Sequence, residues 1–498
     1  MKNVTEYLER TAAAFPDKTA VTDEYGSLTF GELRNNARRA ACGLKIMRNT
    51  PVPVLMEKSS AAVTAFFAAL YAGGFYVMLN PDLPDERLRR IFQRTEAPCI
   101  VTDTAHSELA ARLGEQVRIL LIDDLISNEE NTDLLGEIAS SSIDTDPVYA
   151  NFTSGSTGEP KGMIISHRSV IDFIDVFTET FGINQTDIIG NQAPFDFDVS
   201  VKDIYSAVCT GAELVIIPKR LFSLPQELLD FMCEHRLTTL IWAVSALSLV
   251  CVFHGLDYKV PTTVRRVMFS GEVMPAKHLN AWLSHLPDAQ FVNLYGPTEI
   301  TCNCTYHVID RGRDYSGGLP IGRAFPNERV FLLDGDCEVI KPRREGEICV
   351  SGTAVGIGYM GDFAATERSF IQNPCNKLYY ERIYKTGDIG FYGEDGEIYY
   401  IGRRDFQIKH QGHRIELEEI ERSVMKIDGV EDSCCVYDDR RKRIYCFYTG
   451  SADSESIMDS LSKELPQFML PNRIIAANEG IPLTKNGKKD RKELLKRV

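Results

Sequence analysis

The sequence predicts an α/β protein with a large N-terminal domain and a small α+β C-terminal domain, and three observations support this fold class. The chain has 498 residues, more than one ordinary core accommodates. Helical and β-branched segments alternate up to about residue 400, which is the α/β pattern. Beyond that point the chain is more charged and has the pattern of a short α+β unit. We therefore expect domains at residues 1–403 and 404–498.

The stretch at residues 59–80 is uncharged and mostly apolar. It is long enough that a membrane span has to be considered. Gly73 and Gly74 divide it into a helix-like half (Ala61–Ala72) and a strand-like half (Phe75–Leu79). Each half is too short to cross a bilayer. We expect a buried helix that leads into a buried strand.

Later segments continue the alternation. We expect strands at Val215–Ile217, Leu240–Ala243 and Val264–Phe269, and a helix at Pro225–His235. Near the proposed domain boundary, the Asp-Gly pair at 395–396 predicts a hairpin turn between two strands. In the C-terminal domain, Leu417, Ile420 and Val424 recur at helical spacing, which predicts an amphipathic helix.

Composition excludes several classes of function. The formal net charge is −15, which argues against a general nucleic-acid binder and against a polybasic membrane anchor. The N-terminus lacks the continuous apolar run of a signal peptide. The thirteen cysteines show no paired CxxC spacing, and we interpret them as reduced thiols. We expect a cytoplasmic protein that neither binds nucleic acid nor inserts into a membrane.

The sharpest signal is the segment TSGSTGEPKG at residues 153–162. Its glycines let backbone N–H groups approach a phosphate, its hydroxyls donate hydrogen bonds, and its lysine adds positive charge. It is not a Walker A loop, because Gly162 rather than Ser or Thr follows the lysine. Apolar runs on both sides predict strand–loop–strand, and the alternative is a flexible Gly/Ser turn. The predicted phosphate-binding residues are Thr153, Ser154, Gly155, Ser156, Thr157, Gly158 and Lys161.

The segment NLYGPTE at residues 293–299 suits a nucleotide. Tyr295 offers a flat ring for adenine to stack on, and Asn293 can hydrogen-bond a base edge. Thr298 supplies a phosphate donor, and Glu299 supplies a ligand for Mg²⁺, which prefers one or two carboxylates plus phosphate oxygens. The alternative is a plain Gly-Pro turn.

Two further residues suit the ribose of ATP. Asp388 follows a Thr-Gly turn and could accept hydrogen bonds from both ribose hydroxyls. Arg403 precedes the domain boundary, where it could reach the ribose or a phosphate. The alternatives are an exposed turn aspartate and a surface salt bridge.

Together these segments resemble the adenylate-forming superfamily, which includes acyl-CoA synthetases, luciferases and amino-acid adenylation domains. Further matching segments follow in the family's order: LTFGEL (28–33), YAGGFYVMLNP (71–81), FDFDVS (195–200), GEICVSG (346–352), YKTGD (384–388), GRRDFQIKHQGHRIELEEIE (402–421), LPQFMLP (465–471) and NGKKDR (486–491). The resemblance implies doubly wound sheets plus a distorted barrel in the large domain, and a mobile small domain.

The resemblance also assigns roles. It identifies Lys488 as the catalytic lysine that bridges the substrate carboxylate and the α-phosphate, where negative charge accumulates. It adds Gly271, Glu272 and Gly296 to the ATP site. It identifies Asp405 as the hinge about which the small domain rotates between two half-reactions. Gly412 would then approach the pantetheine arm of a carrier, or else be an ordinary hairpin glycine.

For the substrate, Asp198 matches the aspartate that binds the α-ammonium in amino-acid-activating members. The alternatives are a helix N-terminal aspartate or a pair with Lys202 at i,i+4. The side-chain pocket implied by the resemblance comprises Val199, Lys202, Trp242, Met268, Ser270, Leu294, Cys302 and Asn303.

The chain is most similar to free-standing D-alanine–carrier-protein ligases, with two departures. Ser270 replaces a cysteine of those ligases, and Lys202 replaces an apolar residue. If Lys202 points into the pocket, it favours an acidic substrate. If it points away from the pocket, Trp242 and Met268 narrow the pocket and favour a substrate with a small side chain. We expect a small or acidic amino acid and leave the choice open.

The sequence thus predicts an enzyme that converts an amino acid and Mg-ATP to aminoacyl-AMP and pyrophosphate. It would then transfer the aminoacyl group to the phosphopantetheine thiol of a separate carrier protein, working as a monomer. No general base is needed, because a carboxylate is already ionised at neutral pH. The basic run at residues 440–443 is either a carrier-docking patch or a solvated hairpin. The competing hypotheses are an acyl-CoA or aryl-CoA synthetase and a non-catalytic nucleotide-binding module.

Overall fold

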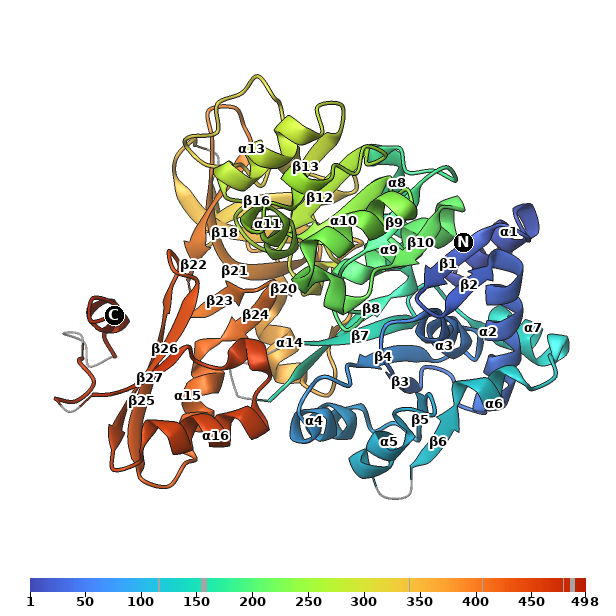
Figure 1. Ribbon diagram of the computed structural model, residues 1–498, viewed down its shortest axis with the longest axis horizontal. Helices are drawn as coiled ribbons and strands as arrows, with labels where there is room; N and C mark the ends of the chain where they lie inside the picture. Colours follow the sequence, from blue (N-terminus) through green and yellow to red (C-terminus); the bar gives the residue numbers. More distant parts are fainter. Residues whose placement is uncertain (115–116, 154–158, 340, 405, 478, 484–488) are drawn as a thin grey trace.

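The computed structural model describes residues 1–498 apart from 115–116, 154–158, 340, 405, 478 and 484–488 (Figure 1). It is a mixed α/β structure in which three sheets occupy the chain up to Arg403 and two small sheets follow. The α/β prediction is therefore confirmed, with a large N-terminal domain and a smaller C-terminal one. The exact boundary at 403/404 stays a prediction.

The largest sheet has the order β15-β14-β13-β12-β11-β9-β10-β1-β2. Its strands from β13 to β1 run parallel, while β2, β14 and β15 pair antiparallel at the two ends. Its strands are β1 (Thr19–Asp23), β2 (Gly26–Thr29), β9 (Ile188–Asn191), β10 (Glu213–Ile216), β11 (Thr239–Ala243), β12 (Arg266–Ser270), β13 (Gln290–Tyr295), β14 (Thr305–Val308) and β15 (Arg323–Ala324).

The second sheet has the order β19-β8-β7-β4-β3-β5-β6 and is parallel from β7 to β6. Antiparallel pairing of β7 with β8, in which Thr153 lies opposite Lys161, confirms the predicted strand–loop–strand. The strands are β3 (Pro51–Leu55), β4 (Phe75–Leu79), β5 (Cys99–Thr102), β6 (Arg118–Leu121), β7 (Pro147–Thr153), β8 (Lys161–Ser166) and β19 (Gly358–Tyr359).

Helices lie on both faces of these sheets, as doubly wound folds require. The main core joins both sheets with α1 (Thr5–Ala14), α2 (Phe30–Leu44), α3 (Ser60–Tyr71), α6 (Ile122–Ile126), α7 (Thr132–Ser141), α8 (His167–Phe181) and α9 (Val199–Thr210). A second core lies under η1 (Lys219–Ser223), α10 (Pro225–Glu234), α11 (Val244–Val252), α12 (Gly255–Tyr258) and α13 (Ala276–His285). A third lies under α4 (Asp85–Thr95) and α5 (Ser107–Leu113).

The uncharged stretch at residues 59–80 forms helix α3 and strand β4, which confirms that prediction. The side chain of Ser59 caps α3 by accepting a hydrogen bond from the N–H of Ala62 at 3.2 Å. Nearly every residue of α3 is buried, which explains why the segment shows no polar face. In the part of the chain that the structure describes, no helix has the length and apolarity that a bilayer span requires.

Where the resemblance implies a distorted barrel, the structure has an antiparallel sheet. It contains β16 (Glu328–Asp334), β17 (Cys337–Glu338), β18 (Glu345–Gly352), β20 (Phe370–Gln372), β21 (Arg382–Tyr392) and β22 (Ile398–Arg403), and it is flanked by α14 (Phe363–Ser369). Strands β21 and β22 pair antiparallel across the Asp-Gly turn, as predicted.

The C-terminal part begins with the hairpin of β23 (Gln407–His410) and β24 (His413–Glu416). It continues with α15 (Leu417–Met425), β25 (Val430–Asp438), β26 (Arg443–Gly450), α16 (Ser454–Glu464), η3 (Gln467–Met469), β27 (Arg473–Ala476) and α17 (Arg491–Leu495). Leu417, Ile420 and Val424 are buried in its core, so the predicted amphipathic helix is confirmed.

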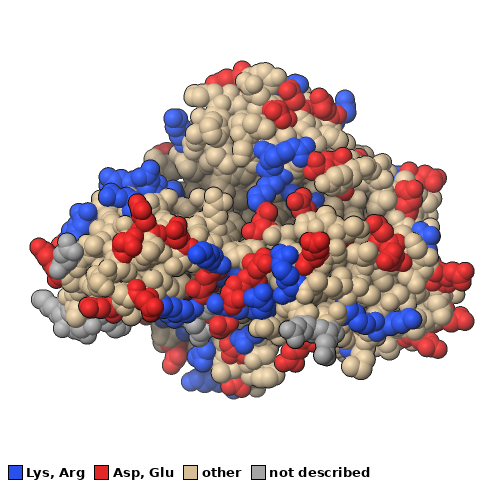
Figure 2. Space-filling model, turned by 60° about the horizontal axis from the view of Figure 1, so that its bottom comes forward, with Lys and Arg blue, Asp and Glu red and all other residues tan. Residues whose placement is uncertain are grey.

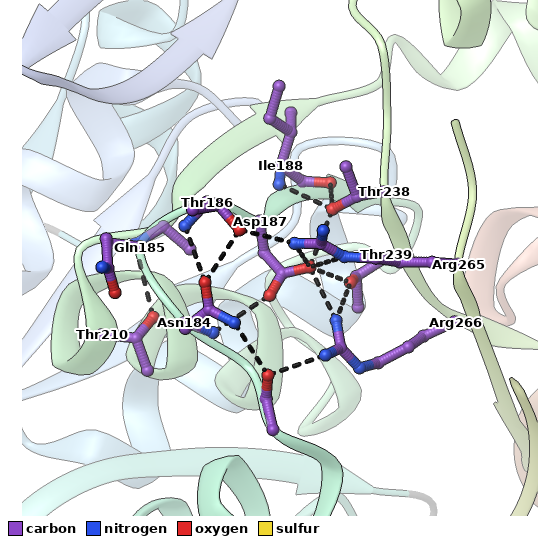
Figure 3. Close-up of polar contacts among 12 residues, drawn as sticks. Asn184, Gln185, Thr186, Asp187, Ile188, Thr210, Thr238, Thr239, Arg265 and Arg266 are labelled. Atoms are coloured by element: carbon purple, nitrogen blue, oxygen red, sulfur yellow. Dashed lines mark hydrogen bonds and ion pairs between the residues drawn. The ribbon is translucent and has the colours of Figure 1, made fainter.

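The amino ends of β9, β11 and β12 are joined by one buried carboxylate, that of Asp187 (Figure 3). Its Oδ1 accepts hydrogen bonds from Arg265, from Arg266 at 2.7 Å, and from the hydroxyls of Thr238 and Thr239. Burial alone would raise the pKa of Asp187, but these donors and the N–H of Asn184 bring it below its ordinary value. This end of the sheet is therefore closed by a fully bonded ion cluster.

Candidate active site

The predicted site residues meet at the opposite, carboxyl end of the parallel strands, where ligands bind in open α/β sheets. Ser270 ends β12, Tyr295 ends β13 and Thr153 ends β7. A cavity of about 130 Å³ lies among them. The predicted residues that line it are Thr153, Asp198, Val199, Ser270, Gly271, Gly296, Thr298, Cys302, Asn303, Asp388 and Arg403.

A second, larger cavity of about 700 Å³ adjoins the first. Among the predicted residues, Gly271, Glu272, Asn293, Leu294, Tyr295, Gly296 and Arg403 line it. Its walls also include the aromatic rings of Phe391, Tyr399 and Tyr400. A flat, partly apolar space of this size suits a purine base.

Asp388 lines the smaller cavity and is buried. The Tyr295 hydroxyl donates to its Oδ2 at 2.6 Å, and Arg403 Nη1 donates to its Oδ1 at 2.7 Å. Lys409 Nζ lies 5.4 Å from the centre of the Tyr295 ring. In this arrangement the small domain therefore covers the ring on which adenine was expected to stack.

Glu299 is buried and is held from two sides. Arg414 Nη1 donates to both of its carboxylate oxygens, at 3.0 and 2.9 Å, and the Tyr359 hydroxyl donates to Oε1 at 2.8 Å. Burial alone would raise the pKa of Glu299, but Arg414 and Tyr359 bring it below its ordinary value. Glu299 is thus an ionised carboxylate engaged by the small domain.

The carboxylate of Glu299 fits a magnesium ion of the kind that accompanies ATP. A single carboxylate is what Mg²⁺ uses when phosphate oxygens and water supply the other ligands. Among the described residues, no group of three or more acidic, histidine or cysteine side chains could hold a metal by itself. The ion would neutralise phosphate charge. Because Arg414 engages both oxygens of Glu299 here, Arg414 and the metal compete for the same carboxylate.

The phosphate loop is described only at its ends. Ser154, Gly155, Ser156, Thr157 and Gly158 lie outside the described residues, and so do the predicted hinge Asp405 and the predicted catalytic Lys488. Lys161 begins β8, and its ammonium lies 5.6 Å from the centre of the Tyr359 ring. Burial lowers its pKa.

Asp198 stands at the N-terminus of α9, but its side chain makes no capping hydrogen bond. Its place at the helix N-terminus agrees with one alternative interpretation, although it does not cap the helix. It forms no salt bridge with Lys202 among the described residues, but the charge of Lys202 acts on it, so the ammonium-binding role stays a prediction. Burial raises its pKa, against the lowering influence of Lys202 and of a hydrogen bond with Thr298. A partly buried carboxylate that lines a cavity is suited to a cationic ligand.

Lys202 is completely buried on α9, one helical turn after Asp198. Its ammonium donates to Oδ1 of Asn303, which lines the smaller cavity. Burial lowers the pKa of Lys202, opposed by Cys302, Asp198 and Asp203. The ammonium is thus directed toward the wall of the pocket, with one side chain between it and the cavity.

The structure does not bring Trp242 and Met268 to the pocket. The Trp242 indole donates to the Gly190 carbonyl at 2.8 Å and packs against Phe222 in the second core. Met268 lies in the main core. Side chains alternate between the two faces of a strand, and neither position lines the described cavities. Leu294 lines the larger cavity instead of the smaller one.

Sequence reasoning missed the side chains that the small domain contributes. His413 stacks on Phe468 at 3.5 Å and meets Phe197 edge-on at 4.6 Å, so these rings close the smaller cavity. Arg414 and Lys409 reach the site from the same hairpin. The one signal in the sequence was the cationic composition of KHQGHR. Composition does not reveal which residues, more than a hundred positions away in the chain, these side chains contact.

Further contacts hold the small domain in this position. Arg87 on α4 pairs with Glu419 on α15 at 2.6 Å, and both side chains are buried. Arg90, one turn later, pairs with Glu464 on α16 at 3.0 Å. The N–H of Gly412 donates to Glu272 at 2.7 Å, at the mouth of the larger cavity.

Comparison with known proteins supports the geometry. The AMP-binding enzyme family matches residues 8–360, and the AMP-binding enzyme C-terminal domain matches residues 419–488. Zwittermicin A synthase ZmaJ of Bacillus cereus is 32% identical over 99% of this chain and 94% of its own length. Tyrocidine synthase 1 of Brevibacillus parabrevis is 30% identical over 99% of this chain, which spans 45% of that protein.

A solved structure described as holo-PA1221, an NRPS protein containing adenylation and PCP domains bound to a vinylsulfonamide inhibitor, has the same fold. It has a TM-score of 0.84, is 23% identical, and the match covers 100% of this chain and 84% of that one. The chain belongs to the AMP-binding enzyme family and is an ATP-dependent adenylate-forming enzyme of the adenylation-domain type. Enzymes of this family use ATP and Mg²⁺.

Proposed function

We propose that this enzyme activates an amino acid and passes it to the phosphopantetheine thiol of a separate carrier protein. The observation that carries the proposal is Asp198, a partly buried carboxylate that lines the cavity without capping its helix or forming a salt bridge with Lys202. Such a group costs free energy unless a cation compensates it, and the α-ammonium of an amino acid supplies that cation.

In the first half-reaction, a carboxylate oxygen of the amino acid forms a bond to the α-phosphorus of ATP, and pyrophosphate leaves. Thr298 and the phosphate loop bind the phosphates, Glu299 holds Mg²⁺, and Lys488 stabilises the charge that accumulates at the α-phosphate. Asp388 binds the ribose hydroxyls, and Tyr295 and Asn293 bind the adenine.

In the second half-reaction, the carrier thiolate attacks the carbonyl of the aminoacyl-adenylate and AMP leaves. The present arrangement suits this step, because the Gly412 hairpin lies at the site and Arg414 occupies the carboxylate that the metal needs. Rotation about Asp405 would exchange this arrangement for the one that brings Lys488 to the site.

For the substrate we propose an acidic amino acid. The alternative, a small one, depended on crowding by Trp242 and Met268, and neither lines the described cavities. The Lys202 ammonium contacts Asn303 in the pocket wall. A side-chain carboxylate that displaced or bridged Asn303 would pair with this buried cation and restore charge balance.

We further propose that the enzyme acts as a cytoplasmic monomer. All thirteen cysteines are free thiols, as a reducing compartment requires. The basic residues 440–443 form the turn between β25 and β26, where Lys442 pairs with Asp439 and Arg441 with Asp438. Carrier docking there is a hypothesis, since local ion pairs already account for part of this charge.

The competing function is activation of an acyl or aryl acid for transfer to CoA. Asp198 discriminates between the two, because an ammonium anchor contributes nothing to a fatty acid. A non-catalytic role is a second alternative, and retention of Lys161, Glu299, Asp388 and Lys488 argues against it.

The test is ATP–pyrophosphate exchange across proteinogenic L-amino acids, their common D-isomers, β-alanine, and fatty and aryl acids. We expect one strong signal, with aspartate or glutamate. A strong signal with D-alanine instead would exclude the acidic pocket and keep the amino-acid class. Exchange that survives Lys488→Ala unchanged would remove the role proposed for that lysine.

A further inference from the structure

A third hollow is lined in part by Lys161 and has a different character from the two cavities of the site. It measures about 330 Å³ and lies between β18, β21, α14 and the β23–β24 hairpin. Six cationic side chains line it: Lys161, Arg368, Lys385, Arg403, Arg404 and Arg414. Glu347 and Glu416 are the acidic residues among its described lining, and Arg403 and Arg414 also pair with Asp388 and Glu299, which leaves a formal excess of two positive charges. We call this hollow the basic cleft.

The charge of the basic cleft contrasts with the rest of the molecule. The chain has a net charge of −15, and Figure 2 shows a face on which basic and acidic side chains are interspersed. Basic residues that converge in a concave site raise the local concentration of anions. The cleft is therefore suited to a small ligand with several negative charges.

The basic cleft is continuous with the reaction site. Arg403 and Arg414 line both the cleft and the smaller cavity, and Lys161, one of the predicted phosphate-binding residues, lines the cleft. Arg414 donates to both carboxylate oxygens of Glu299 and lines both hollows, so it stands between the smaller cavity and the cleft. An anion that leaves the reaction centre past Arg414 enters a space lined by Arg368, Lys385 and Arg404.

Glu347 positions two of these outer cations. It is buried, and its Oε2 pairs with Lys385 at 3.1 Å and with Arg404 at 3.3 Å, while the Gly387 N–H donates to Oε1. Arg368, in the last turn of α14, is exposed and makes no hydrogen bond or ion pair among the described residues. Two of the cations are thus held in place, and a third is available to a ligand.

We propose that the basic cleft binds inorganic pyrophosphate, or an equivalent diphosphate anion, after it leaves the reaction centre. Arg368 and Lys385 are the outer binding residues. This inference rests on the proposed adenylation half-reaction for the origin of the ligand. Its function would be to hold the product away from the acyl-adenylate while the small domain occupies the present position.

The test measures binding of sodium pyrophosphate to the intact protein by isothermal titration calorimetry, without ATP, in about 0.15 M salt to screen distant surface charge. The variant is Arg368→Gln combined with Lys385→Gln. We expect its affinity for pyrophosphate to fall about tenfold or more, since charge-assisted bonds to phosphate are stronger than neutral ones. Product inhibition by pyrophosphate should weaken in parallel, with the KM for ATP changed less than about twofold.

A matched control is Arg112→Gln with Lys259→Gln. Arg112 lies in the last turn of α5, as Arg368 does in α14, and Lys259 pairs with Asp230 much as Lys385 pairs with Glu347. An unchanged affinity in the cleft variant would overturn the proposal, and so would an equal loss in the control. Direct binding does not depend on the amino-acid substrate, so failure of the proposed substrate leaves this test intact.

Discussion

Buried charged side chains have different kinds of partner at the two ends of the largest sheet. At the amino ends, Asp187 is bonded by two arginines and two threonines that all belong to the same domain. At the carboxyl ends, the buried charges of Glu299 and Lys202 have partners that are removable, either on the small domain or in the pocket wall. The comparison teaches that the amino end serves stability, while the carboxyl end is arranged for exchange of partners.

The largest expected effect is a difference in stability between two aspartate-to-asparagine variants, one at each end of the sheet. Asp187→Asn should destabilise the protein by about 3 kcal/mol or more, because it leaves Arg265 and Arg266 without their carboxylate. The expected fall in melting temperature is about 3–4 °C, because the unfolding entropy of a domain of about 400 residues is large. Asp198→Asn should leave the melting temperature within about 2 °C or raise it, since burial already disfavours that charge. Thermal unfolding of both variants checks this, and equal destabilisation would contradict the proposed division.

A second prediction concerns activity of the same pair. Asp198→Asn should lower amino-acid-dependent pyrophosphate exchange about a hundredfold, because a buried ion pair with the substrate ammonium is lost. Exchange by Asp187→Asn, assayed well below its melting temperature, should stay within about threefold of the wild type. If Asp187→Asn lost as much activity as Asp198→Asn, the two ends of the sheet would not be functionally distinct.

A third prediction concerns Lys202, the buried cation at the carboxyl end of the sheet, and its effect on substrate preference. Lys202→Met keeps the length and apolar stem of the side chain and removes the charge. We expect exchange with the acidic substrate to fall about 10- to 100-fold and the relative rate with small amino acids to rise. An unaltered order of preference among substrates would show that the ammonium does not determine specificity.

Substitutions at the contacts between the two domains are expected to have smaller effects. They should change the rate of one half-reaction and leave the rate of the other unchanged. Arg87→Gln should slow aminoacyl transfer to the carrier about tenfold and leave pyrophosphate exchange unchanged, because the pair with Glu419 exists in the present arrangement. Single-turnover transfer from preformed aminoacyl-adenylate measures this. The exchanged pair Arg87→Glu with Glu419→Arg should recover part of the rate, and its failure to do so would indicate a general packing defect.

Much of the fold followed from the sequence because its signals are local. The helix of residues 60–71 and the strand of 75–79 were predictable from an uncharged run broken by two glycines. The strands that flank the phosphate loop were predictable from their apolar residues. Resemblance extended this to the residues at the carboxyl ends of the sheet.

Other features depend on geometry that sequence does not encode locally. Trp242 faces the second core because strand alternation directs it there, although its neighbour in sequence ends the strand at the site. Arg414 and His413 reach Glu299 and Phe197 across more than a hundred residues. The basic cleft combines cationic residues from five separate segments of the chain, and no single segment predicts it.

The central claim is that Asp198 anchors the α-ammonium of an amino acid, and a substrate pair tests it most directly. Pyrophosphate exchange should be measured with glutamate and with glutarate, and with aspartate and succinate, in wild type and in Asp198→Asn. We predict that the wild type prefers the amino acid about a hundredfold and that the substitution removes most of this preference. Equal exchange with the deamino acids in the wild type, or activity with fatty or aryl acids alone, would contradict the account.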